Sequence, residues 1–378
     1  MDYETERKKL RSLVLIIFQK VLLYNLYNNM KGMIHPYEFA VTVRSSTYMQ
    51  NGKNITIKCI AEKMNISPST VSRALNGKSG VSKEVREQIV ALSQEMNYQT
   101  NRIAQSLRTS KSMEIGVIIP DSSNPFFSAM LTGIDSYARE MGYTLLMINS
   151  CNAPEVERRA IETFCELHVA GLLSVPTCVK HYDHLPMPVI FLTRCDNSDS
   201  NFNYIITDDV EGGYIATQSL INSNLSDFYF LCDSTDIISS ANRLAGYKSA
   251  LEENGITPKQ DWVFDGANTI ADGYRIFKEL QTMASGRYGI LCHNDYVAVG
   301  VLKSALDYGI VPGRDIRLIG YDDIELISYL TPALSTVRQA KFDIGTWGAK
   351  SLISIINNGP REKPFHIVLK PELIIRDT

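Results

Sequence analysis

At 378 residues the chain is too long for one typical domain, and its hydrophobic content of 44% is ordinary for a soluble globular protein. None of its seven cysteines forms a C-x-x-C pair, so the sequence carries no zinc or thioredoxin signature. The net charge of −3 divides unevenly: residues 54–112 hold nine Lys and Arg against four Glu, whereas residues 113–378 hold 21 Lys and Arg against 33 Asp and Glu. A basic module fused to a larger acidic one favours a polyanion partner for the basic module only, with a solvated charged surface as the alternative.

Residues 1–53 are predicted to be a poorly ordered or loosely helical extension. A basic segment, Glu6–Arg11, precedes an apolar run, Leu13–Tyr24, and this order resembles a signal peptide. Gln19 and Lys20 interrupt the run, which is shorter than the ~20 residues that span a bilayer, and no small-x-small cleavage site follows it. A membrane-bound or partner-docking helix is the alternative.

Residues 54–100 predict three short helices. A polar residue that can cap a helix precedes each of them: Thr56, Ser67 and Ser82. Asn65 suits the tight turn after the first helix (57–63), because Asn accepts the left-handed conformation better than most residues. The inward-facing residues recur at helical spacing: Ile57, Ile60, Ala61 and Met64, then Val71, Ala74 and Leu75, then Val85, Ile89, Leu92 and Met96.

Two helices joined by a short turn and braced by a third is the helix-turn-helix plan. Ser69, Thr70, Ser72 and Arg73 on the exposed face of the second helix suit base edges and phosphates. From spacing alone, an ordinary three-helix bundle with a polar face fits equally well.

Beyond Ile115 the chain alternates between apolar strands and amphipathic helices, which predicts parallel sheets with right-handed crossovers. The first run, Ile115–Pro120, is β-branched and continuously apolar, as in a strand buried on both faces. The other expected strands are 144–149, 170–175, 188–193, 227–232, 262–265, 288–292 and 315–319, with a closing extended stretch at 365–375. The expected helices are 126–141, 154–167, 211–223, 241–254, 270–284, 295–308 and 341–357.

Several motifs together resemble one family. In the basic module they are Thr56-Ile57, Ile60-Ala61, Thr70-Val71-Ser72-Arg73 and Asn101-Arg102-Ile103-Ala104-Gln105-Ser106-Leu107. In the remainder they are Asn124-Pro125-Phe126-Phe127, Arg243-Leu244-Ala245-Gly246-Tyr247, Asn294-Asp295, Gly320-Tyr321-Asp322-Asp323 and Ser335-Thr336-Val337-Arg338-Gln339. Residues 54–378 are thereby similar to the lactose/galactose repressor (LacI/GalR) family of bacterial transcription regulators.

The resemblance implies a helix-turn-helix headpiece at 54–100, a hinge helix and linker at 101–112, and a two-lobed effector-binding and dimerisation domain at 113–378. The fold class is thus an all-α headpiece joined to an α/β sensor like a periplasmic binding protein, with parallel sheets and helices on both faces. Three chain crossings between the lobes are expected, near 207–210, 337–341 and 364–368.

The family's DNA contacts transfer to both parts of the basic module. Arg73 could make the bidentate contact to guanine. In the hinge, which should fold only on DNA, Ala104 approaches the minor groove and Leu107 wedges between base pairs. The residues so assigned are Thr56, Ser67, Pro68, Ser69, Thr70, Ser72, Arg73, Asn76, Asn101, Arg102, Ala104 and Leu107.

The family's effector positions map to Asp121, Asn124, Phe127, Arg194, Ser239, Arg243, Asn294 and Asp322. Carboxylates, amides and guanidinium groups hydrogen-bond sugar hydroxyls, and an aromatic ring covers the apolar face of a sugar. Thr193 stands where an aspartate often precedes the cleft arginine, so the identity of the sugar stays open. Cys59 likewise stands where an acidic residue is usual, and Thr100 replaces the proline before the hinge.

We expect no enzyme activity, cofactor or metal, because no Walker A loop, G-x-G-x-x-G or nucleophile elbow occurs and the H-x-x-H of His181 and His184 lies in an expected loop. The leading hypothesis is a cytoplasmic, nucleoid-associated repressor of carbohydrate-utilisation genes. It would bind a near-palindromic DNA operator as a homodimer, respond to a small sugar-like effector and need no membrane. A regulator that depends on a corepressor or partner protein is one alternative, and a sugar-binding transport or receptor protein is another.

Overall fold

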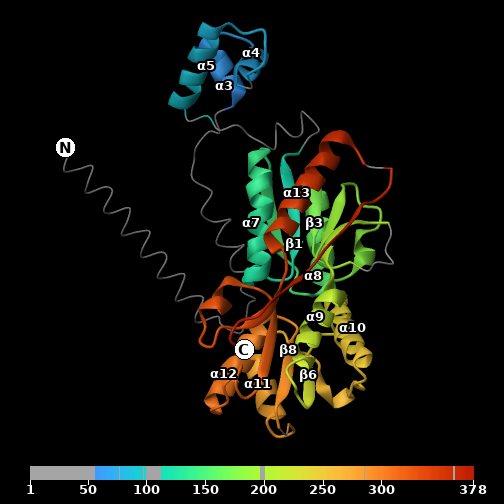
Figure 1. The fold of residues 1–378 in the computed structure, drawn as a ribbon. Coiled ribbons are helices and arrows are strands. Elements are labelled where there is room, and N and C mark those ends of the chain that lie inside the picture. The colour runs from blue at the N-terminus through green and yellow to red at the C-terminus, as the bar shows by residue number, and fades with distance from the viewer. Residues whose placement is uncertain are drawn as a thin grey trace, which may run out of the picture. The chain divides into compact units, whose positions relative to one another are not determined.

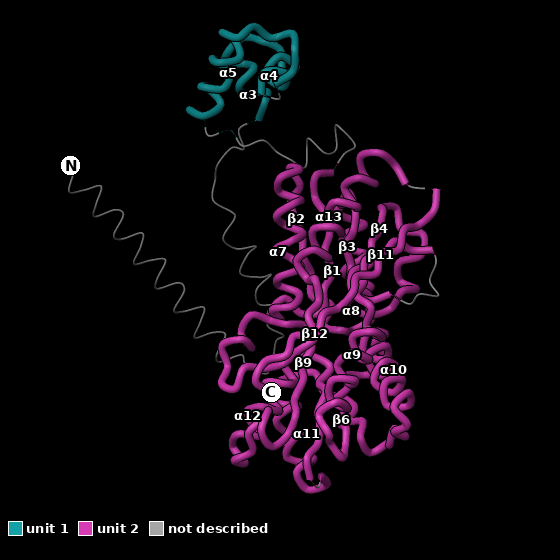
Figure 2. The backbone as a smooth tube through the Cα atoms, viewed as in Figure 1, with its two compact units in different colours: residues 1–102 teal, residues 103–378 magenta. Residues whose placement is uncertain are grey.

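A computed structural model describes residues 56–98 apart from 76 and 97, and residues 112–378 apart from 196–200, 285 and 361. The chain divides into two compact units, Met1–Arg102 and Ile103–Thr378 (Figure 2). The predicted extension at 1–53 and residues 101–111 of the predicted hinge and linker (101–112) lie outside the described residues. No helix of the described parts is both long and apolar enough to cross a membrane.

In the first unit, the structure confirms three helices: α3 (Ile57–Met64), α4 (Pro68–Leu75) and α5 (Lys83–Glu95). Their buried core consists of the predicted inward-facing residues Ile60, Ala61, Val71, Ala74 and Ile89. The spacing of apolar residues therefore identified the packed faces correctly.

The helix ends in this unit follow the predictions with one exception. Asn65 is left-handed, with φ of 53°, and Ser67 Oγ accepts a hydrogen bond from Thr70 N at 3.1 Å. Ser82 Oγ accepts one from Val85 N at 3.4 Å. The prediction that Thr56 caps α3 is wrong, because its hydroxyl makes no capping bond and instead contacts Cys59 Sγ at 3.4 Å.

The second unit contains two six-stranded sheets, each at the centre of one lobe (Figure 1). The first-lobe sheet has the order β11-β5-β4-β3-β1-β2 and is parallel throughout. The second-lobe sheet has the order β12-β10-β9-β8-β6-β7, and only β12 runs antiparallel to its neighbour. The first-lobe strands are β1 (Glu114–Ile119), β2 (Thr144–Asn149), β3 (Gly171–Ser174), β4 (Val189–Leu192), β5 (Asn203–Thr207) and β11 (His366–Leu369). The second-lobe strands are β6 (Asp227–Leu231), β7 (Val263–Phe264), β8 (Tyr288–Cys292), β9 (Arg317–Asp322), β10 (Ser335–Arg338) and β12 (Glu372–Ile374).

Helices cover both faces of each sheet. The first lobe has α7 (Pro125–Glu140), α8 (Pro154–Glu166) and α13 (Lys341–Asn358). The second lobe has α9 (Asp209–Ile221), α10 (Ile238–Glu253), α11 (Ile270–Leu280) and α12 (Asp295–Asp307), and Figure 1 shows the pairs α9–α10 and α11–α12 on opposite sides of its sheet. Strand β1 is apolar throughout because both of its faces are buried: Ile115 and Val117 pack with α7 and α13, whereas Ile118 packs with α8.

The chain crosses between the lobes three times. The first two crossings, between β5 and α9 and between β10 and α13, lie where they were predicted. The predicted third crossing at 364–368 is wrong, because residues 366–369 form β11 in the first-lobe sheet and the chain crosses only at 370–371, before β12. The structure also adds β5 and β10, two strands that the sequence pattern did not indicate.

Candidate functional site

A cavity of about 370 Å³ lies in the second unit, lined by residues of both lobes. Its wall is built from loops after the carboxyl ends of β1, β4, β6, β8 and β9, where ligands of open parallel sheets bind. The eight predicted effector residues all line this cavity: Asp121, Asn124, Phe127, Arg194, Ser239, Arg243, Asn294 and Asp322. The structure thus brings together side chains that are up to 201 positions apart in the sequence.

Arg243 is a buried cation held by the second lobe. Its Nε donates to Asp209 Oδ1 at 2.8 Å, its Nη1 donates to the backbone oxygen of His293, and its guanidinium lies 3.6 Å from the centre of the Tyr321 ring. Burial alone would lower the pKa of Arg243, but the Asp209 carboxylate outweighs it, so the pKa is raised. Arg243 therefore stays charged beside the cavity, with Asp209 as its counter-ion.

Arg194 is a buried cation of the first lobe, and its charge is compensated far less than that of Arg243. Its Nη1 donates to Asn152 Oδ1 at 2.7 Å, and among the described residues it forms no ion pair. Burial lowers the pKa of Arg194 to about 10, although the carboxylate of Asp233 opposes the shift. A guanidinium has five N–H donors, so Arg194 keeps donors for a ligand in the cavity.

Asp322 is presented to the cavity from a strained backbone. Asp322 and Asp323 have backbone φ angles of 111° and 52°, which residues other than glycine rarely adopt. Gln339 Nε2 donates to Asp322 Oδ1 at 2.7 Å, and Lys341 Nζ donates to the backbone oxygens of Asp322 and Asp323 at 2.9 and 2.7 Å. Burial raises the pKa of Asp322 to about 6.

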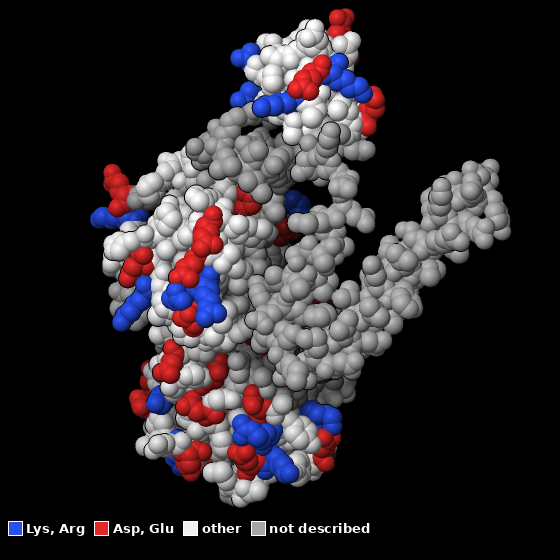
Figure 3. Space-filling model, turned by 180° about the vertical axis from the view of Figure 1, so that it is seen from behind, with Lys and Arg blue, Asp and Glu red and all other residues white. Residues whose placement is uncertain are grey.

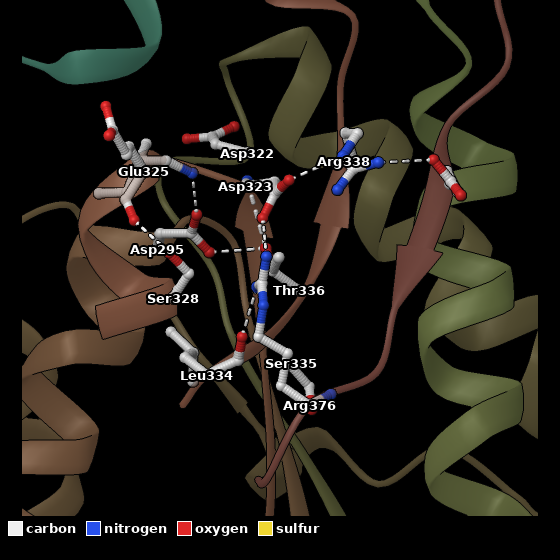
Figure 4. A network of polar contacts seen from close by, with 12 residues as sticks. Asp295, Asp322, Asp323, Glu325, Ser328, Leu334, Ser335, Thr336, Arg338 and Arg376 are labelled. Atoms are coloured by element: carbon white, nitrogen blue, oxygen red, sulfur yellow. Dashed lines mark hydrogen bonds and ion pairs between the residues drawn. The ribbon is translucent and has the colours of Figure 1, made fainter. Parts of the chain in front are cut away.

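The neighbouring Asp323 has a structural role. Figure 4 shows its carboxylate between Arg338 and Arg376, which donate to it at 2.7 and 2.6 Å. The wholly buried carboxylate of Asp295 lies close by and accepts a hydrogen bond from Thr336 Oγ1 at 2.7 Å. The two consecutive aspartates therefore have different roles: Asp322 lines the cavity, and Asp323 anchors the turn.

Three of the predicted effector residues also organise the local backbone. Asp121 accepts hydrogen bonds from the backbone N and the hydroxyl of Ser123 at 2.9 and 2.8 Å. Asn124 caps α7, and Asn294 caps α12 by accepting from Val297 N at 2.8 Å. A ligand that contacts these side chains would share them with the helix ends.

Other residues that line the cavity were not predicted from the sequence. His293 follows β8 directly and Asp233 lies two residues after β6, so the rule that ligands bind beyond strand ends could have found them. Burial, together with Arg243 and Arg194, lowers the pKa of His293 well below its usual value, so the imidazole is neutral. Tyr296 had no sequence signal: its hydroxyl donates to the backbone oxygen of Ser123 at 3.2 Å and so links the two lobes.

In the first unit, α4 presents the predicted DNA-reading face. Pro68, Ser69 and Arg73 are exposed, whereas the predicted contacts Thr70 and Ser72 are half-buried. Among the described residues, the guanidinium of Arg73 has no hydrogen-bond or ion-pair partner. Arg86 of α5 donates to the backbone oxygens of Ala74 and Lys78 and thereby holds the end of α4. The predicted contacts Asn76, Asn101, Arg102, Ala104 and Leu107 lie outside the described residues.

The surface of the second unit shows charges of both signs side by side. In the view of Figure 3, Asp and Glu on this unit lie next to Lys and Arg. Arg158 and Glu155 of α8 form one ion pair of this unit. The acidic excess of this unit is therefore not gathered into one acidic patch on that face.

Two family profiles match the chain. The profile described as "Bacterial regulatory proteins, lacI family" matches residues 56–101, and "Periplasmic binding protein-like domain" matches residues 217–378. The HTH-type transcriptional repressor PurR of Vibrio campbellii is 30% identical over 329 residues, which are 85% of this chain and 98% of that protein. The ribose operon repressor of Haemophilus influenzae is 29% identical over 326 residues, with the same coverage. Among solved structures, the Lac repressor dimer bound to operator and the anti-inducer ONPF has a TM-score of 0.78 and 25% identity, covering 86% of this chain and 99% of that one.

Proposed function

The chain belongs to the lacI family of bacterial regulatory proteins, and from its cavity we propose that its effector is a small neutral sugar and that it represses carbohydrate-utilisation genes. The protein is a DNA-binding transcriptional repressor under the control of a small molecule. The relatives are repressors, and we propose that this chain likewise catalyses no reaction. Because it acts on DNA, it is cytoplasmic, and association with the nucleoid is part of the proposal.

The observation that carries the sugar proposal is the mixture of charges on the cavity wall. A hydroxyl can donate to a carboxylate and accept from a guanidinium, so Arg194 and Asp322 can both be satisfied by one polyol. Phe126 and Phe127 provide apolar surface for the face of a sugar ring.

The same wall argues against a phosphorylated effector. Arg243 already has the Asp209 carboxylate as counter-ion, which leaves Arg194 as the cation available to a ligand. A phosphate would bring more negative charge towards the carboxylates of Asp233 and Asp322, which also line the cavity.

A thermal-shift screen of the full chain tests the sugar class. We expect a neutral mono- or disaccharide to raise the midpoint temperature of thermal unfolding, since a free ligand concentration of a hundred times Kd adds about 2.7 kcal/mol of stability. Asp322→Asn should abolish the shift, whereas Glu325→Gln, an exposed carboxylate near the same turn, should keep it. A shift only with sugar phosphates or nucleobases would overturn the proposal.

On DNA, we propose that the protein acts as a homodimer on a near-palindromic operator, with 54–100 as reader, 101–112 as hinge and 113–378 as sensor. The α4 residues Pro68, Ser69 and Arg73 would meet the major groove, and Leu107 would enter the minor groove. Leu107→Ala should weaken operator binding while leaving effector affinity intact, as gel shift and calorimetry would report. Loss of both would refute this division of labour.

The sign of the response decides between two modes of control. We propose induction, in which the sugar weakens operator binding by about 1–3 kcal/mol of coupling free energy. An operator titration with and without the active sugar measures this, and tighter binding would instead identify a corepressor.

A further inference from the structure

The amino group of Lys341 joins the two lobes at the cavity. Lys341 is the first residue of α13 in the first lobe, and its Nζ donates to the backbone oxygens of Asp322 and Asp323 in the second lobe. Bonds from an ammonium are stronger than those from neutral donors. Since both aspartates have positive φ, the two bonds also stabilise a turn that is costly to form.

Within the second lobe, hydrogen bonds at several points tie the turn at Asp322 and Asp323 to its neighbours. Gln339, two residues before Lys341, binds the carboxylate of Asp322 that lines the cavity. The buried Asp295 accepts hydrogen bonds from Ile324 N at 2.9 Å and from Thr336 Oγ1 on β10 (Figure 4). A ligand that shifts Asp322 therefore shifts the whole turn, including the two oxygens that Lys341 binds.

On its first-lobe side, Lys341 begins a helix that is in backbone contact with α7. A Cβ added to Gly133 of α7 would lie 2.2 Å from the backbone oxygen of Phe342, and one added to Gly345 would lie 2.1 Å from that of Met130. With no side chain between them at these points, α13 and α7 should move as one body. Helix α7 itself begins at the cavity, where Asn124 caps it.

We propose that Lys341 is a coupling residue, which transmits effector occupancy at Asp322 to the α7–α13 helix pair of the first lobe. It sets how strongly the effector changes operator binding, and it contributes little to effector affinity. This inference rests on the proposed function, in which a small molecule in the cavity controls DNA binding.

Hydrogen exchange of the full chain tests the link without knowledge of the effector. Lys341→Met keeps the length of the side chain and removes its donors, so backbone amides of residues 322–327 should exchange about tenfold faster or more. Lys341→Arg, which keeps the charge and the donors, should restore slow exchange. Lys350→Met, an exposed change on the same helix, should leave these amides as in the wild type. Unchanged exchange at 322–327 in Lys341→Met would overturn the proposal, and Lys341→Gln gives the same reading should the Met variant not fold.

A second measurement separates coupling from binding. With D-ribose as the probe, we expect a thermal shift in both the wild type and Lys341→Met, but a change of exchange within α7 in the wild type only. A D-ribose effect on α7 that survives in Lys341→Met would also overturn the proposal. If D-ribose leaves the wild type unchanged, this sugar is excluded from the proposed function, and the exchange at 322–327 alone decides the role of Lys341.

Discussion

The ion pair of Arg243 and Asp209 shows how much a single buried side chain can matter. Both groups are almost wholly buried, and each satisfies the other at 2.8 Å. Arg243→Met should destabilise the protein by about 3–5 kcal/mol, because it leaves the Asp209 carboxylate buried without its counter-ion. Urea unfolding measures this. Arg158→Met, which breaks two surface ion pairs on α8, with Glu155 and with Glu162, is the control and should change little.

Asp322 should make stability depend on pH between about 4 and 6. Its pKa is about 6 in the folded chain against 3.8 for an ordinary aspartate, and burial is the cause. Between these two pKa values, the folded state keeps a proton on Asp322 that the unfolded state has lost. The free energy of unfolding therefore has its full contribution from this proton below about pH 4, the unfolded pKa, and loses that contribution as the pH rises through about 6.

Asp322→Asn removes this titration. We expect the wild type to lose stability relative to Asp322→Asn as pH rises from about 4 to 6, with a constant difference above that range. Urea unfolding at several pH values gives the comparison, and Glu325→Gln should follow the wild type throughout. If the free energies of unfolding of the wild type and Asp322→Asn changed in parallel with pH, burial would not raise the pKa of Asp322.

At the scale of elements, three helix pairs pack through glycines on both partners. In α7–α13, α9–α10 and α11–α12, a Cβ on either glycine would lie within about 2.2 Å of a backbone oxygen of the other helix. Gly133→Ala should cost about 1–3 kcal/mol, since overpacking a tight contact forces the backbone to move. Thermal unfolding would show this, with Ser128→Ala on the exposed side of α7 as control. An unchanged midpoint for Gly133→Ala would show that α7 and α13 can separate at little cost.

Elements could be predicted where their own residues carry the signal. Strand β1 was clear because its apolar run is continuous, as burial on both faces requires. Strands β5 and β10 were missed, because residues such as Asn203, Ser335 and Thr336 suggest loops; the structure buries β10 because β9 and β12 flank it. A pattern along the chain does not report neighbours that come from elsewhere in the sequence.

The same limit explains what was missed in the cavity. Asp322 and Arg243 stand in recognisable motifs, and Asp233 and His293 stand at strand ends. Tyr296 binds the backbone of a residue 173 positions away, a contact that only the folded lobes create. The spatial assembly of the site, rather than its chemistry, was beyond sequence reasoning.

At the scale of the molecule, Tyr296 should bias the balance between open and closed lobes. Its hydroxyl donates to Ser123 of the other lobe at the cavity, and a neutral hydrogen bond is worth about 0.5–1.5 kcal/mol. Tyr296→Phe should therefore favour the open form by up to about tenfold, seen as a larger radius of gyration in small-angle scattering. Tyr308→Phe, at the exposed end of α12, should scatter like the wild type. An unchanged radius for Tyr296→Phe would mean that other contacts hold the lobes.

The three crossings also determine when each lobe can be completed as the ribosome makes the chain. All second-lobe strands except β12 lie between residues 227 and 338, so this lobe can largely assemble from one continuous stretch of nascent chain. The first lobe begins at β1 but needs α13 and β11, which are synthesised more than 200 residues later. At about 5–20 residues per second, the apolar face of α7 waits on the order of ten seconds or more for its partner helix. The lobe that is begun first therefore stays incomplete until nearly the end of synthesis, and its uncovered face is where a chaperone should bind during synthesis.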